Sequence, residues 1–177
     1  MTDETPAGQE QVQAGGSPPS EWRIPGKLGL EETDALVICC SDRRYRRPME
    51  HFLFKELGLG NYDILAVPGG VYMLSFASVL PKQLKVGMRM VKFIVKNHLV
   101  PRIVLIAHKD CGRYREGFAS WVNRPGFDVV EKQKRDLAET AVALREAFPK
   151  LQVDAFFARD DIGDSVTFST VRKEQAA

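Results

Sequence analysis

Short apolar runs alternate along the chain with longer segments whose apolar residues recur every three or four positions. The runs are residues 35–40, 62–67, 102–107 and 151–158. Each run is short and almost continuously apolar, which is typical of a strand buried on both faces of a sheet. Residues 165–171 instead alternate between apolar and polar side chains, and this pattern predicts an antiparallel edge strand.

Three longer segments carry the helical period. They are residues 48–60, 81–99 and 128–148. Pro48 suits the first turn of the first predicted helix, and Gly58 or Gly60 suits its end. Strands and helices that alternate in this way predict an α/β fold. We expect a mostly parallel central sheet, with four parallel strands and one antiparallel edge strand, flanked by helices.

The length and composition are those of a globular protein with one domain. The chain has 177 residues, and residues 1–20 are rich in Gly, Pro, Gln and Ser. We expect these first residues to form a disordered tail, and residues 21–177 to form the domain. The net charge of +2 is too small to indicate a nucleic-acid partner, and no apolar run is long enough for a membrane span. The acidic N-terminus lacks the pattern of a signal peptide, so we expect a cytoplasmic protein.

The sequence contains three cysteines, which are Cys39, Cys40 and Cys111. An odd and low number argues against a disulfide framework in a cytoplasmic protein. It favours metal binding, catalysis or simple burial. The side chain of Cys39 should point away from that of Cys40, and we expect it to be a small buried hydrophobic residue.

Potential metal ligands follow two of the predicted parallel strands. In such sheets, ligands bind beyond the carboxyl ends of the strands. The first strand ends at Cys40, and the third is followed by His108 and Cys111, which lie three residues apart before a glycine. Two thiolates and one imidazole are typical zinc ligands. The alternative interpretations are a buried structural zinc or three unrelated core residues.

Asp42 and Arg44 share the side-chain direction of Cys40, because alternate residues of an extended chain point the same way. Three protein ligands leave one position of a tetrahedral zinc open, and open zinc sites are catalytic. If Asp42 pairs with Arg44, that position stays open to water. If Asp42 binds the metal instead, the site is closed, and the spacing alone does not decide between the two.

These residues resemble the two motifs of the β-class carbonic anhydrases. The family motif Cys-x-Asp-x-Arg corresponds to Cys40-Ser41-Asp42-Arg43-Arg44. The motif His-x-x-Cys followed by Gly corresponds to His108-Lys109-Asp110-Cys111-Gly112. The resemblance covers roughly residues 34–171 and implies a parallel sheet with an antiparallel edge strand.

The resemblance also implies a metal, an activity and an assembly. Cys40, His108 and Cys111 would bind one zinc ion per subunit, and Asp42 with Arg44 would orient the zinc-bound hydroxide or control the fourth position. The implied enzyme is a lyase, a carbonate dehydratase that hydrates carbon dioxide reversibly to bicarbonate and works as a homodimer or a dimer-based oligomer. The alternative is a carbonic-anhydrase-like zinc protein with a closed site, or one that acts on carbonyl sulfide or carbon disulfide. Because two thiolates cancel the charge of Zn(II), we expect activity to rise into the alkaline range.

The end of the second predicted strand departs from the family pattern. Many members carry Arg-Asn-Ala-Gly there, whereas this chain has Ala66-Val67-Pro68-Gly69-Gly70. We expect backbone N–H groups around Gly69 and Gly70 to donate hydrogen bonds to the substrate. A small, neutral, linear substrate needs an apolar pocket with few donors. The predicted apolar wall consists of Val67, Pro68, Val71 and Tyr72.

Other charged residues and histidines have simpler interpretations. Arginines at positions 43, 44, 46 and 47 could form a nucleic-acid patch. The nearby acids Asp42 and Glu50 and the small net charge favour a solvated helix start instead. We expect His51 and His98 to be surface or packing residues.

Overall fold

The computed structural model describes residues 32–75, 81–161 and 165–172, together with Glu21 and Pro25. Contacts divide the chain into Met1–Leu30 and Glu31–Ala177, and the fold described here belongs to the second part. The tail expected over residues 1–20 lies outside the described residues. Among the helices that the structure describes, none is both long enough and apolar enough to cross a membrane.

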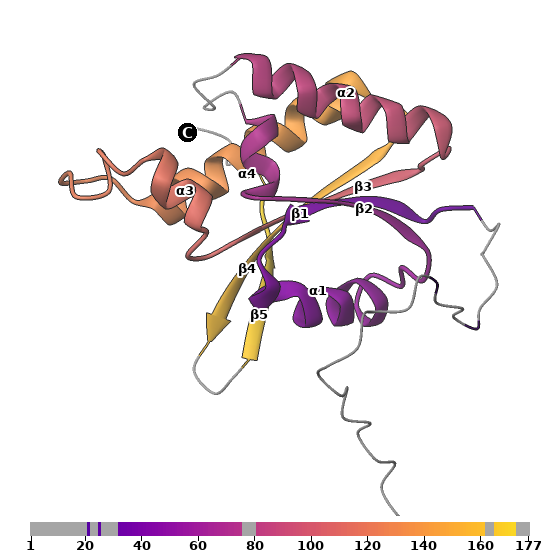
Figure 1. Ribbon diagram of the computed structural model, residues 1–177, viewed down its shortest axis with the longest axis horizontal. Coiled ribbons are helices and arrows are strands. Elements are labelled where there is room, and N and C mark those ends of the chain that lie inside the picture. Colours follow the sequence, from indigo (N-terminus) through magenta and orange to yellow (C-terminus); the bar gives the residue numbers. More distant parts are fainter. Residues whose placement is uncertain (1–20, 22–24, 26–31, 76–80, 162–164, 173–177) are drawn as a thin grey trace, which may run out of the picture. The chain divides into compact units, whose positions relative to one another are not determined.

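A five-stranded sheet forms the centre of the fold (Figure 1). Its strands are β1 (Ala35–Cys40), β2 (Tyr62–Val67), β3 (Arg102–His108), β4 (Gln152–Asp161) and β5 (Ser165–Thr170). They lie in the order β2-β1-β3-β4-β5, and all neighbours are parallel except β4 and β5. The predicted fold class and the antiparallel edge strand are therefore confirmed. The chain moves to one side of β1 for β2 and to the other side for β3, so the switch point lies at β1.

Helices cover both faces of the sheet (Figure 1). One face packs against α2 (Pro81–Asn97), α4 (Val129–Ala147) and the 3-10 helix η1 (Gly70–Leu74). The other face packs against α1 (Arg43–Lys55). Alternate residues of β1 enter the two cores, with Leu36 and Ile38 on one face and Val37 and Cys39 on the other. Burial on both faces explains why this strand is continuously apolar.

Helix α1 begins earlier than its sequence pattern predicts. Asp42 is the N-cap residue, and its carboxylate accepts a hydrogen bond of 3.0 Å from the backbone N–H of Arg44. Pro48 therefore lies inside the helix rather than in its first turn, and that prediction is wrong. The helix also ends earlier than predicted, at Lys55 rather than near residue 60. Gly58 follows with a left-handed φ of 67°, as expected of a glycine near a helix end.

Two short elements were not predicted. The 3-10 helix η1 follows β2, and α3 (Gly112–Gly117) follows Cys111 directly. Neither spans enough residues to show a periodic pattern in the sequence. The other two helices agree with their predicted segments, and Asp128 caps α4 by accepting a hydrogen bond of 2.7 Å from the N–H of Val130.

Candidate metal centre

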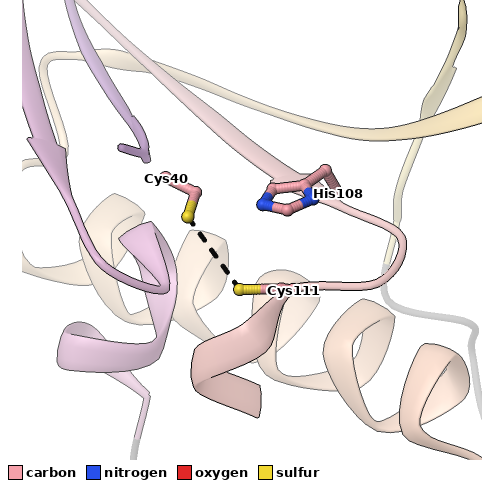
Figure 2. Close-up of side chains that lie close together, drawn as sticks. All are labelled: Cys40, His108 and Cys111. Atoms are coloured by element: carbon pink, nitrogen blue, oxygen red, sulfur yellow. Dashed lines mark hydrogen bonds between the residues drawn. The ribbon is translucent and has the colours of Figure 1, made fainter. Parts of the chain in front are cut away.

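Three predicted ligands converge beyond the carboxyl ends of β1 and β3 (Figure 2). Cys40 ends β1, His108 ends β3, and Cys111 is the N-cap residue of α3. Their ligand atoms all lie within 4.8 Å of one another, and the sulfur atoms of Cys40 and Cys111 are 3.9 Å apart. Two sulfurs bound to one tetrahedral zinc at about 2.3 Å lie about 3.8 Å apart. The observed spacing therefore suits a single zinc ion.

The imidazole of His108 presents one nitrogen to the two sulfurs (Figure 2). Its Nδ1 lies 2.7 Å from the carbonyl oxygen of Lys109. Since a carbonyl can only accept, Nδ1 carries the hydrogen and Nε2 carries the lone pair. Nε2 is buried and has no hydrogen-bond partner among the described residues. A buried acceptor without a partner is unfavourable, and a metal ion at this place would satisfy it.

The turn between the two motif residues brings them together. Asp110 adopts a left-handed φ of 58°, a conformation that Asp tolerates better than most residues. The chain then enters α3, where the N–H groups of Tyr114 and Arg115 both donate to the carbonyl of Cys111 at 3.1 Å. His108 is further held by the ring of Tyr45, whose centroid lies 4.3 Å from that of the imidazole.

The two adjacent cysteines of β1 differ in their electrostatics. A hydrogen bond with Cys111 lowers the pKa of the Cys40 thiol, and the backbone N–H of Gly69 adds to this at 3.3 Å. Burial instead raises the pKa of Cys39 to about 12. These donors stabilise a thiolate at Cys40, and the same hydrogen bond raises the pKa of Cys111. Cys39 stays a neutral thiol inside the core beneath α1.

Asp42 and Arg44 form an ion pair at the edge of this centre. Nη2 of Arg44 lies 2.7 Å from Oδ2 of Asp42, and this hydrogen-bonded pairing lowers the pKa of Asp42 to about 2. Arg44 also donates to the carbonyl of Asp110 at 3.3 Å, so it links the loops after β1 and β3. Oδ2 of Asp42 lies 4.0 Å from Nε2 of His108. The carboxylate is therefore next to the three ligands but engaged with the guanidinium.

The glycines after β2 pack against β1. Gly70 has a φ of +50°, and a Cβ there would lie 2.6 Å from the carbonyl carbon of Cys39. Gly69 has a φ of +82°, and its N–H donates to the sulfur of Cys40. This N–H thus contacts a candidate ligand.

A cavity of about 340 Å³ opens beside the end of β2. It is lined by Val67, Pro68, Tyr72, Met73, Lys82, Gln83, Val86, Gly87 and Arg113. Val67, Pro68 and Tyr72 thus lie together, as expected of an apolar wall, whereas Val71 is fully buried in the core. The guanidinium of Arg113 lies over the ring of Tyr72, 5.0 Å from its centroid.

Two contacts of the centre were missed in the sequence. The side-chain amide of Gln133 on α4 donates to the carbonyl of His108 at 2.9 Å. The ring of Tyr45 packs on the same histidine. Tyr45 directly follows the first motif, which is a weak signal, but nothing in the sequence distinguishes Gln133 from other helical residues.

The two other histidines and Arg46 of α1 have simple structural roles. His51 is exposed on α1, and His98 pairs with Asp63 at 2.9 Å. Arg46 pairs with Glu50 one helical turn away at 3.0 Å. Together with the Asp42–Arg44 pair, this contact supports the interpretation of the arginine cluster as a solvated helix start.

Comparisons with known proteins place the chain in a family. A family model described as "Putative carbonic anhydrase" matches residues 30–166. An uncharacterized protein of Rickettsia bellii is 27% identical over 131 residues, which cover 72% of this chain and 77% of that protein. The match to the family model spans most of the chain. The chain therefore belongs to this carbonic anhydrase family, and the predicted family resemblance is confirmed.

Two solved β-carbonic anhydrases are also similar to the chain. CafA of Aspergillus fumigatus has a TM-score of 0.49 and 17% identity, covering 82% of this chain and 79% of that chain. Isoform I of Trichomonas vaginalis has a TM-score of 0.49 and 13% identity, covering 85% of this chain and 88% of that chain.

Proposed function

We propose that the protein is a zinc-dependent carbonic anhydrase, which hydrates carbon dioxide reversibly to bicarbonate. The observation that carries this proposal is the cluster of Cys40, His108 and Cys111. Its two sulfur atoms have the spacing of a tetrahedral zinc site, and its three ligand atoms all lie within 4.8 Å of one another. Membership of a carbonic anhydrase family supports it. The proposed class of enzyme is a carbonate dehydratase.

Cys40, His108 and Cys111 would hold one zinc ion per subunit. The donor set of two thiolates and one imidazole is soft enough for zinc and unsuited to magnesium or calcium. When bound with an open position, zinc acidifies a water molecule and so supplies a nucleophile near neutral or alkaline pH. The unpartnered Nε2 of His108 fits a ligand role, because its tautomer is already fixed by the Lys109 carbonyl.

Asp42 would orient the reacting water at the fourth position. Its carboxylate is ionised at neutral pH, and Arg44 lowers its pKa further, to about 2. Its Oδ2 can accept a hydrogen bond, which fixes the direction of a donor next to His108. The ion pair with Arg44 favours an open site over a closed one, since it occupies the carboxylate.

The substrate would approach from the side of β2. Val67 and Pro68 give this side an apolar wall, which suits a neutral linear molecule with few atoms. Gly69 would act indirectly, through its hydrogen bond to Cys40, and Gly70 by letting the loop approach β1. Carbonyl sulfide and carbon disulfide have the same shape as carbon dioxide and therefore belong in the same test.

Stopped-flow hydration of carbon dioxide near pH 8.5 tests the proposal, on protein of measured zinc content. Cys111→Ser is the control, because it removes one ligand and changes one atom. We expect fast hydration that the control loses. Full zinc content without hydration of any of the three substrates would contradict the proposed activity and favour a closed or structural site.

We further propose that the enzyme is a cytoplasmic homodimer or dimer-based oligomer. Three apolar side chains of α2 support association, since Val86, Met90 and Phe93 are 55%, 42% and 64% exposed. Cysteines stay reduced in a cytoplasm, which keeps Cys40 and Cys111 available as thiolate ligands. Light scattering after size-exclusion chromatography measures the oligomeric state, and a monomer at micromolar concentration would contradict the dimer.

A further inference from the structure

A buried polar side chain of α4 supports the end of β3. The side chain of Gln133 is 1% exposed, and its Nε2 donates to the carbonyl of His108 at 2.9 Å. Glutamine is seldom buried to this extent without a specific partner. The partner here is the backbone of a candidate zinc ligand, which lies far away in the sequence.

The geometry of the sheet explains why this carbonyl needs a partner outside the sheet. β1 pairs with β3 only as far as Cys39 opposite Ile106. The N–H of Lys109 donates to the carbonyl of Ala158 in β4 at 2.8 Å. The carbonyl of His108 belongs to the same peptide group and points the opposite way, toward the side where β1 has ended. The side-chain amide of Gln133 therefore donates the hydrogen bond that a backbone N–H of a neighbouring strand would otherwise donate.

The position of this carbonyl also determines the position of the imidazole. The peptide that carries the His108 carbonyl leads directly to Lys109, whose own carbonyl accepts the hydrogen bond from Nδ1 of the ring at 2.7 Å. A shift of the His108–Lys109 peptide would move the ring and its acceptor together. The lone pair of Nε2 would then turn away from the sulfurs of Cys40 and Cys111.

The same face of α4 reaches the other ligand-bearing segment. Asp136, which lies almost one turn after Gln133, is fully buried, pairs with Lys132, and interacts with Tyr114 of α3. Tyr114 is 1% exposed and follows Cys111 by three residues. One helix thus contacts both the strand that ends at His108 and the helix that begins after Cys111.

We propose that Gln133 is a positioning residue of the metal centre. It fixes the end of β3 so that Nε2 of His108 meets the two sulfur atoms. This inference rests on the proposed metal site and adds a residue outside both family motifs. Hydrogen bonds around a metal ligand typically change metal affinity by about 10- to 100-fold.

The test is Co²⁺ binding to the full chain after zinc has been removed. Gln133→Met removes the donor and keeps the length of the side chain. Thr140→Val is the matched control, because Thr140 is 2% exposed, lies on the same face of α4, and has a hydroxyl with no hydrogen-bond partner among the described residues. The dissociation constant comes from a chelator competition, and the absorption bands of thiolate-bound Co²⁺ report the ligand geometry.

We expect Gln133→Met to weaken Co²⁺ binding by about tenfold or more and to shift the Co²⁺ bands, with Thr140→Val within about twofold of the wild type. Thermal unfolding of the metal-free variants separates affinity from folding. If Gln133→Met does not fold, Gln133→Asn carries the same expectation, since it keeps an amide that is too short to reach. Unchanged affinity in a folded Gln133 variant, or an equal loss in Thr140→Val, would overturn the proposal. Wild-type protein that binds Co²⁺ but, with zinc, does not hydrate carbon dioxide would overturn the activity and leave this role of Gln133 intact.

Discussion

The ends of β3 and β2 lie on opposite sides of β1 and are built in opposite ways. At the end of β3, both the carbonyl and the Nδ1 of His108 have hydrogen-bond partners, from Gln133 and Lys109. At the end of β2, Val67 and Pro68 present apolar surface to a cavity, and hydrogen bonds come from the backbone. The end of β3 thus holds a ligand through its hydrogen bonds. The end of β2 provides an apolar cavity and contributes one backbone hydrogen bond, from Gly69 to Cys40.

This difference matches two different chemical requirements. A metal ion needs ligand atoms held at fixed positions, and only directional hydrogen bonds and close packing hold side chains in that way. A small neutral substrate has no charged group to recognise, so an apolar wall suffices. Substitutions at the two strand ends should therefore affect metal affinity and turnover separately.

The largest expected effect is at the end of β3. His108→Gln should weaken zinc binding by more than about a hundredfold, because a neutral amide is a poor ligand for zinc beside two thiolates. His98→Gln is the matched control, since His98 is exposed and pairs with Asp63. Zinc competition titrations of both variants measure the effect. Equal affinities would show that the imidazole of His108 does not hold the metal.

The next effect concerns the packing of the β2 loop on β1. Gly70→Ala should lower the free energy of unfolding by about 2–4 kcal/mol, since a Cβ would meet the backbone of Cys39 and the φ is left-handed. Gly58→Ala also has a left-handed φ, but a Cβ there meets nothing within 4 Å. We expect this control to lose only about 1 kcal/mol. Urea unfolding measures the free energy of unfolding of both variants. Equal losses in the two variants would contradict the close packing of Gly70 against β1.

A smaller, pH-dependent effect concerns the support of the β3 side. Burial raises the pKa of Asp136 above its ordinary value. A carboxyl with a raised pKa in the folded state binds more protons when folded, so the free energy of unfolding falls as pH rises from about 4 through the folded pKa. Asp136→Asn should lack this fall. Urea midpoints at pH 4 and pH 7 measure this fall. If variant and wild type depend on pH in the same way, the pKa of Asp136 is not raised in the folded state.

The smallest effect is expected for the apolar wall. Pro68→Ala should change zinc affinity by less than about twofold, because Pro68 lines the cavity and is not among the three ligands. A change in kcat/KM for carbon dioxide at constant zinc content would assign the wall to the substrate. A large loss of zinc would instead show that the two strand ends are not separate.

Much of this arrangement could be predicted from the sequence, because topology does most of the positioning. Apolar runs defined the strands, and parallel strands bring Cys40 and His108 to one edge whatever the details of packing. The start of α1 is less evident, because Pro48 favours a first turn at that residue whereas Asp42 caps the helix six residues earlier. Gln133 was missed for a different reason. Its role depends on where β1 stops beside β3, which is a tertiary property that no local pattern carries.

Asp42 also affects the conformational equilibrium of the site. The same carboxylate caps α1 and pairs with Arg44. Turning it toward the sulfur atoms would break both contacts, and loss of an N-cap alone costs about 1 kcal/mol. That amount changes a two-state population about fivefold. Any ligand that draws Asp42 into the metal centre must therefore also supply the free energy to fray the first turn of α1.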